Sequence, residues 1–251
     1  MHAPFKKRLL AKERLIGTLV TLPTTEMAEI SAGAGFDWLF LDMEHGLLDL
    51  GAVQKIVQTV GERCPCLIRV PVNEEVWIKK ALDIGSAGLI FPHLNTPEEA
   101  ASVVRQSRYP PQGARSMGLA RAQGYGARFD EYLAAANKET TLVAQVEHID
   151  AVRNIDWILD VPGIDAAFIG PYDLSASLNK PGRVADPDVV EAIGLVRKAC
   201  EARGKPVGIF VRDTETAAKA LMGGFSLVCV GMDVTLFSKI ESQVVKELKP
   251  A

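Results

Sequence analysis

The sequence predicts an α/β fold of the (β/α)8 TIM-barrel type. Eight short β-rich runs alternate with helical patterns along the 251 residues of the chain. Most of the runs are continuously apolar, as expected of parallel strands that are buried on both faces. The length agrees with the size of about 250 residues that is typical of this barrel. No Gly-x-Gly-x-x-Gly motif follows the first run and no Walker A motif occurs, which disfavours nucleotide-binding open sheets and a nucleotide cofactor.

The order of the elements can be read from apolar runs and helix signals. In the segment TPEE, Thr96 is a candidate N-cap, Pro97 suits the first helical position and Glu99 completes a capping box. Apolar residues at positions 50, 53, 56, 57 and 60 form one face of a helix. Val234–Leu248 also has a helical apolar face, so it is either the eighth barrel helix or an interface helix. The expected strands are Ile16–Val20, Trp38–Asp42, Cys66–Val70, Gly88–Phe91, Thr141–Glu147, Ala166–Gly170, Val207–Val211 and Leu227–Gly231.

Composition excludes several classes of function. The net charge is −3, with no clustered basic stretch of the kind that nucleic-acid binding requires. No run reaches the roughly 18 apolar residues of a membrane helix, and the N-terminal segment lacks the features of a secretory signal. Cys64 and Cys66 are too close together for the usual zinc motif, and four scattered cysteines in a chain of this length are typical of reduced intracellular thiols. We therefore expect one domain over residues 1–251, located in the cytoplasm and acting on a small polar molecule.

Polar side chains gather at the ends of the predicted strands. Barrels of this type place their active sites at the C-terminal ends of the strands, which converge at one mouth. An active site is therefore expected at that mouth. The residues that end or follow the predicted strands there are Asp42, Glu44, His45, Arg69, His93, Gln145, Glu147 and Asp173.

Glu147 and Asp173 follow neighbouring strands and form a candidate metal site. Two adjacent carboxylates repel each other unless a proton or a cation lies between them. Oxygen ligands favour Mg²⁺, Mn²⁺ or a similar divalent ion. Gln145 lies on the same strand face as Glu147, because side chains alternate along a strand. The alternative is that Glu147 caps a helix, Asp173 stabilises a turn and Gln145 is a hydrogen-bonded core amide.

Two further residues suggest acid–base and oxyanion chemistry. Arg69 ends an apolar strand and needs an anion, either Glu147 or Asp42 as a structural partner or an oxyanion that develops in a reaction. His45 lies beside Asp42 and is a candidate general base. Asp83 is a possible partner for His45. It precedes the fourth strand, however, so only a neighbouring subunit or an unusual loop would bring it to the mouth.

The motifs resemble those of the metal-dependent, class II pyruvate aldolases typified by 4-hydroxy-2-oxoheptanedioate aldolase. Residues 36–45, FDWLFLDMEH, are similar to the FDWxxxDxEH segment of that family. The similarity continues through 68–70 (IRV), 109–115 (YPPQGAR), 145–147 (QVE) and 168–175 (FIGPYDLS). It covers nearly the whole chain in the order found in the family.

The resemblance implies a role for each site residue. Glu147 and Asp173 match the ligands of a divalent metal, Mg²⁺, Mn²⁺ or Co²⁺. Apart from the resemblance, Asp42 at the end of the second strand is a possible partner of the residues that hold the metal. Arg69 matches the arginine that stabilises an enolate-like transition state. His45 matches the catalytic base, and Asp83 matches the acidic residue that raises the basicity of that base. Gln145, Tyr172 and Asp173 match residues that contact the substrate.

The implied reaction is reversible cleavage of a 4-hydroxy-2-oxoacid to pyruvate and an aldehyde through a metal-bound pyruvate enolate, without a Schiff-base lysine. Family members are commonly hexamers that exchange a C-terminal helix, which suits the apolar face of 234–248. The segment Pro92–Asn95 and Tyr172 depart from the family pattern, which leaves the aldehyde open.

Three alternatives remain at this point. An oxaloacetate decarboxylase would use the same site, because decarboxylation passes through the same enolate. An isomerase or epimerase of a phosphorylated sugar would use Gly231-Met232-Asp233 as the phosphate site that is common in barrels. A catalytically silent barrel would serve only for binding or assembly.

Overall fold

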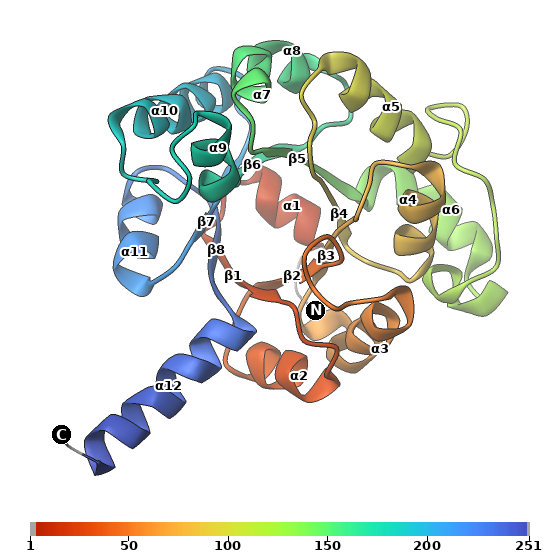
Figure 1. Cartoon of the computed structure of the whole chain (residues 1–251). Helices are drawn as coiled ribbons and strands as arrows, with labels where there is room; N and C mark the ends of the chain where they lie inside the picture. Colours follow the sequence, from red (N-terminus) through yellow and green to blue (C-terminus); the bar gives the residue numbers. More distant parts are fainter. Residues whose placement is uncertain (1–3, 250–251) are drawn as a thin grey trace.

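The computed structural model describes residues 4–249. Eight parallel strands form a closed barrel in the order β1 to β8, and β8 pairs with β1 to complete the ring. Figure 1 shows the strands around a central axis with helices on the outside. This confirms the predicted (β/α)8 barrel. Each strand ends within one residue of its predicted run: β1 (Leu15–Val20), β2 (Trp38–Asp42), β3 (Cys66–Arg69), β4 (Gly88–Phe91), β5 (Thr141–Val146), β6 (Ala166–Ile169), β7 (Val207–Val211) and β8 (Leu227–Met232).

The helices follow the strands as the periodicity indicates. Thr96 caps α5 through a complete capping box with Glu99, as the sequence predicts. Two short 3-10 helices, η1 (Gly61–Arg63) and η2 (Arg121–Gly126), lie in the connections. The helices are α1 (Phe5–Leu10), α2 (Thr25–Gly33), α3 (Leu50–Val60), α4 (Glu75–Asp83), α5 (Pro97–Ser107), α6 (Phe129–Glu139), α7 (Ile149–Arg153), α8 (Ile155–Asp160), α9 (Pro171–Ser177), α10 (Pro187–Ala202), α11 (Thr214–Met222) and α12 (Asp233–Leu248).

The barrel interior is filled at its N-terminal end and polar at its C-terminal end. Trp38, Phe40 and Phe168 pack against one another inside the barrel, with ring centroids 5.5 to 6.2 Å apart. Phe5 and Leu9 of α1 join this interior cluster, so α1 covers the N-terminal end. In Figure 1, α1 is visible through the centre of the ring. A second and larger apolar cluster lies between the strands and the surrounding helices. The filled end leaves only the C-terminal mouth for chemistry.

The last helix is anchored at one end and extends away from the barrel. The carboxylate of Asp233 accepts hydrogen bonds from the backbone amides of Thr21 and Leu22 and from the Thr21 hydroxyl, at 2.7 to 2.8 Å. Figure 1 shows the rest of α12 projecting outward. Its exposed apolar side chains are Val234, Leu236, Phe237, Ile240, Val244, Val245 and Leu248. No helix within residues 4–249 is both long and apolar enough to cross a membrane.

Alanine substitutions at a glycine packed against Trp38 and at an open helical glycine should change the free energy of unfolding in opposite directions. A Cβ at Gly17 would lie 2.5 Å from the Trp38 ring, whereas a Cβ at Gly194 in α10 would meet nothing within 4 Å. Gly17→Ala should therefore lower the free energy of unfolding by about 1–3 kcal/mol through overpacking. Gly194→Ala should raise it by about 0.5–1 kcal/mol, because alanine loses less conformational entropy in a helix. Urea unfolding of both variants checks this, and equal effects at the two sites would contradict the packing described.

Candidate active site

The mouth of the barrel is organised by a buried ion pair between neighbouring strands. Arg69 at the end of β3 donates from Nε and Nη2 to the two carboxylate oxygens of Asp42 at the end of β2, at 2.8 and 2.7 Å. The two residues are 6% and 1% exposed. They are also register partners in the parallel β2–β3 ladder. The sequence left Asp42 and Glu147 open as partners of Arg69, and the structure selects Asp42.

Glu44 adds a second carboxylate to the same guanidinium. Its Oε2 lies 3.0 Å from Arg69 Nη1. Burial raises the pKa of Glu44 and the nearby charge of Glu147 adds to this, while Arg69 opposes it. For Arg69, burial disfavours the charged form, but the carboxylates of Asp42, Glu44 and Glu147 outweigh it, so the pKa of Arg69 is raised. The guanidinium therefore stays charged inside the mouth.

Glu147 directly follows β5 and is held from two sides. Its Oε1 accepts a 2.8 Å hydrogen bond from the backbone amide of His93, and its Oε2 accepts one from the side chain of Gln145. Glu147 is 4% exposed and Gln145 is 2% exposed. Gln145 and Glu147 point into the same mouth, as their alternation along the strand predicts. A Cβ at Gly170 would lie 3.3 Å from the Glu147 Cβ, so this glycine leaves room for the carboxylate.

These residues form a continuous chain of contacts from β2 to β5. We call the set of Asp42, Glu44, Arg69, His93, Gln145 and Glu147 the polar arc. Its members come from the ends of four strands that are consecutive around the barrel. Within the arc, His93 Nε2 lies 3.1 Å from Glu44 Oε1 and His93 Nδ1 lies 3.2 Å from Glu147 Oε1. The arc occupies one side of the mouth.

The donor set of the arc fits a divalent cation. Among the described residues, Glu44, His93 and Glu147 each offer one ligand atom, and these atoms lie within 4.8 Å of one another. The buried carbonyl oxygen of Gln145, beside Glu147, accepts no hydrogen bond from any residue in the range 4–249. Carboxylate and carbonyl oxygens suit Mg²⁺ or Mn²⁺, and imidazole nitrogen suits Mn²⁺ or Co²⁺. Three carboxylates against one arginine also leave a local excess of negative charge that a cation would balance.

The other predicted mouth residues lie beside the arc. His45 follows Glu44, and its side chain is 67% exposed with Nε2 3.9 Å from Glu44 Oε2. Asp173 lies in the first turn of α9 and is exposed, outside the three-residue ligand group. The predicted pairing of Glu147 with Asp173 around a metal stays a prediction. Tyr172 packs edge-on against Phe210 of β7, with ring centroids 6.2 Å apart.

Asp83 lies at the opposite end of the barrel from His45 within one chain. It is the last residue of α4, which runs back toward the start of β4. Its carboxylate accepts a 2.7 Å hydrogen bond from Arg115, whose buried guanidinium stacks 4.5 Å from the Tyr109 ring centroid. Within one chain, Asp83 therefore pairs with Arg115 and not with His45. Contact across a subunit interface stays a prediction.

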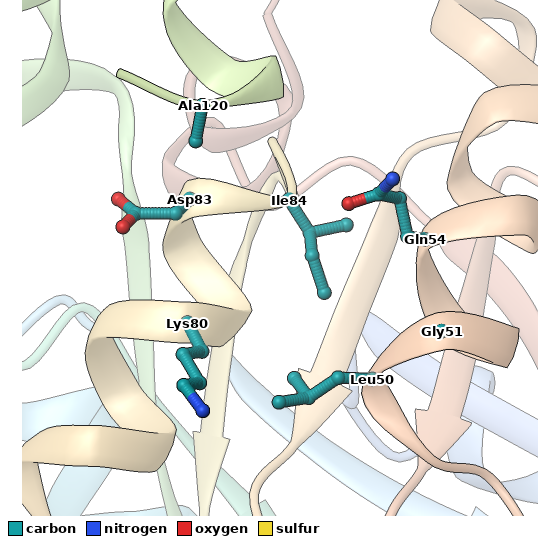
Figure 2. Close-up of a pocket in the computed structure, with 7 residues that line it drawn as sticks. All are labelled: Leu50, Gly51, Gln54, Lys80, Asp83, Ile84 and Ala120. Atoms are coloured by element: carbon teal, nitrogen blue, oxygen red, sulfur yellow. The ribbon is translucent and has the colours of Figure 1, made fainter. Parts of the chain in front are cut away.

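Asp83 also borders a cavity of about 310 Å³ on the outside of the barrel. Figure 2 shows it between α4, which carries Lys80 and Asp83, and α3, which carries Leu50 and Gln54. The cavity has both a charged and an apolar wall.

The segment after β8 that could have formed a phosphate site instead joins α12 to the loop after β1. Gly231 adopts φ +63°, and the chain then places the Asp233 carboxylate against the amides of Thr21 and Leu22. A carboxylate that already occupies these amide donors would repel a phosphate. This geometry disfavours the phosphosugar alternative.

Comparison with known proteins identifies the family. Residues 16–239 match the family described as HpcH/HpaI aldolase/citrate lyase. The chain is 41% identical to a 4-hydroxy-2-oxovalerate aldolase of Rhodococcus jostii, over 94% of this chain and 92% of that protein. It is 40% identical to a hydroxypyruvate/pyruvate aldolase of Cupriavidus necator, over 94% and 88% respectively.

A solved structure gives the same answer for the fold. The crystal structure of an HpcH/HpaI aldolase/citrate lyase family protein from Burkholderia cenocepacia superposes with a TM-score of 0.94 at 36% identity, and covers 97% of this chain and 98% of that one. The chain is therefore a TIM barrel of the aldolase and lyase class. It belongs to the HpcH/HpaI aldolase/citrate lyase family, which confirms the resemblance seen in the sequence.

The buried ion pair predicts a large stability cost when one partner is removed. Asp42→Ala should lower the free energy of unfolding by about 3 kcal/mol, because the guanidinium of Arg69 would lose its bidentate partner while remaining buried. Glu13→Ala, which removes an exposed partner of Arg8, is the control and should change stability by less than about 0.5 kcal/mol. Chemical denaturation measures both. Equal small losses would show that Asp42 does not compensate the buried charge.

Proposed function

We propose that this protein is a divalent-metal-dependent aldolase that reversibly cleaves a 4-hydroxy-2-oxoacid into pyruvate and an aldehyde. The observation that carries this proposal is the charged guanidinium of Arg69, held in the mouth by Asp42 and Glu44. A guanidinium has five N–H donors, and the three contacts to these carboxylates leave donors for an incoming oxyanion. The names of the Rhodococcus and Cupriavidus relatives, both aldolases, support the same reaction class.

In the proposed mechanism, residues at the C-terminal mouth of the barrel carry out each step of the cleavage. Bound Mg²⁺, Mn²⁺ or Co²⁺, with Glu147 and Asp173 as the proposed ligands, would supply Lewis acidity toward the keto oxygen of the substrate. His45 takes the proton of the 4-hydroxyl, and the C3–C4 bond breaks to release the aldehyde. Arg69 stabilises the negative charge on the enolate oxygen. Transfer of the proton held by His45 to the enolate carbon then yields pyruvate and restores the neutral imidazole. Gln145 and Tyr172 contact the substrate.

Hydrogen exchange into pyruvate tests this chemistry without knowledge of the aldehyde. In D2O with Mn²⁺, the protein should exchange the methyl protons of pyruvate, and EDTA or Glu147→Ala should abolish the exchange. Arg69→Lys should slow it about 10²–10³-fold, because one ammonium replaces a fixed fork of donors aimed at the oxyanion. NMR follows the methyl signal, with Glu13→Ala as the control. Full, EDTA-insensitive exchange by Glu147→Ala would refute the proposal.

Carbon–carbon cleavage assays separate the two reactions that share the enolate. An oxaloacetate decarboxylase would also exchange pyruvate protons, but it would release carbon dioxide and no aldehyde. We expect 4-hydroxy-2-oxovalerate and related 4-hydroxy-2-oxoacids to be cleaved with release of their aldehydes. Turnover of oxaloacetate alone would assign the site to decarboxylation.

The exposed face of α12 supports assembly with further copies of the chain. Phe237 and Ile240 are 54% and 60% exposed on a helix whose first residue, Asp233, is buried and firmly bonded. Such a face is covered when helices of two copies pack together. We place this assembly, a hexamer by resemblance, in the cytoplasm, in keeping with four buried cysteines that are free of disulfides. Within it, Asp83 of one copy would reach His45 of a neighbour.

Subunit mixing tests whether the site is shared. His45→Ala and Asp83→Ala should each lower the cleavage rate, because one removes the base and the other its charged partner. In co-expressed mixed oligomers, about a quarter of the sites would combine an intact His45 with an intact Asp83 from a neighbour. Activity should therefore return in the mixture. If mixed oligomers are no more active than either variant alone, Asp83 does not act across an interface.

A further inference from the structure

His93 connects two carboxylates that come from strands which are not neighbours. Glu44 follows β2 and Glu147 follows β5, with β3 and β4 between them in the barrel. His93 follows β4, and its two ring nitrogens lie 3.1 Å from Glu44 Oε1 and 3.2 Å from Glu147 Oε1. Its backbone amide adds a 2.8 Å hydrogen bond to the same Glu147 oxygen. One residue thus fixes the distance between the two carboxylates across the mouth.

The backbone of His93 is strained in order to make these contacts. Its φ is +53°, in the left-handed region that is unfavourable for a residue with a Cβ. The side chain is 67% exposed, so burial of the imidazole does not offset this cost. An exposed residue that keeps a strained conformation at a site is a candidate for function rather than for packing.

A buried acceptor beside these carboxylates points to a cation. The Gln145 side chain is 2% exposed, and its carbonyl oxygen has no donor among the described residues. Its amide nitrogen is bonded to Glu147, so the unpartnered oxygen lies close to that carboxylate. Buried polar atoms without a partner are rare in folded proteins and need an explanation. A divalent cation could bind this oxygen as a ligand, or a water molecule bound to the cation could donate a hydrogen bond to it.

We propose that His93 is a positioning residue that fixes the carboxylate of Glu147, a proposed ligand of the divalent cation, by linking it to Glu44. The inference rests on the proposed function. It concerns the segment Pro92–Asn95, where this chain departs from the family pattern, so the resemblance assigns no role to His93. Partners that orient metal-binding carboxylates typically change metal affinity about 10–100-fold when they are replaced. His93 should therefore set the metal affinity of the substrate-free protein.

Mn²⁺ binding to metal-free, substrate-free protein tests the proposal, measured from the electron paramagnetic resonance signal of free Mn²⁺. His93→Gly removes the imidazole, keeps the backbone N–H and relieves the left-handed strain. Lys12→Gly is the matched control, since Lys12 is exposed with φ +56° and lies outside the polar arc. His93→Asn is a second variant, because asparagine tolerates this backbone conformation but is too short to bridge both carboxylates.

The expected result is that both His93 variants bind Mn²⁺ at least about tenfold more weakly than wild type, while Lys12→Gly is unchanged. Melting temperatures of the metal-free proteins should show that all variants remain folded. Binding by both His93 variants within about twofold of wild type would overturn the proposal, even if the exchange reaction remains metal-dependent. If wild type itself binds no Mn²⁺, the metal dependence of the proposed function fails and this inference fails with it. The wild-type titration alone distinguishes the two cases.

Discussion

The need to compensate one buried positive charge shapes the mouth of this barrel. Arg69 ends a strand whose other residues are apolar, so its guanidinium cannot leave the protein interior. An unpaired charge there would cost several kcal/mol, and the bidentate contact with Asp42 on the neighbouring strand prevents this. Glu44 adds a second negative charge, and His93 carries the network on to Glu147. The same contacts that stabilise the arginine give the mouth its excess of carboxylates.

The two ends of the barrel have different roles, because the N-terminal end stabilises the fold and the C-terminal end carries the candidate active site. The N-terminal end is filled by Trp38 and covered by α1, while the opposite end carries the polar arc on β2 to β5. Across the mouth, Phe210 of β7 and Met232 of β8 pack against the apolar interior cluster. The mouth therefore has an apolar part beside the polar arc. This is the arrangement expected of a site that binds a charged 2-oxoacid on one side and the remainder of the substrate on the other.

Much of the fold could be predicted because it depends on local patterns. Buried parallel strands are continuously apolar, and the Thr96 capping box marks the start of α5 unambiguously. The closing of the barrel by α1 could not be predicted, because six residues with three charges show no clear pattern until they pack on Trp38.

The site was only partly predictable for a related reason. Strand ends identified every member of the polar arc, and the position of Asp83 in the chain correctly placed it at the far end. The contact of His93 with both Glu44 and Glu147 could not be foreseen, since it requires barrel closure and a left-handed residue. The exposure of Asp173 in α9 likewise depends on how the turn after Gly170 directs the helix.

In the proposed reaction, Arg69 is held in place to stabilise an enolate oxygen. Oxalate is a planar dianion that resembles the enolate of pyruvate, so the most direct measurement compares oxalate and pyruvate binding by calorimetry with Mn²⁺ present. Wild type should bind oxalate at least about 10²-fold more tightly than pyruvate, as expected of a site complementary to the reactive state. Arg69→Lys should lose most of this preference, because lysine keeps the charge but not the fork of donors. An unchanged ratio of the two affinities in Arg69→Lys would show that Arg69 does not stabilise the enolate oxygen.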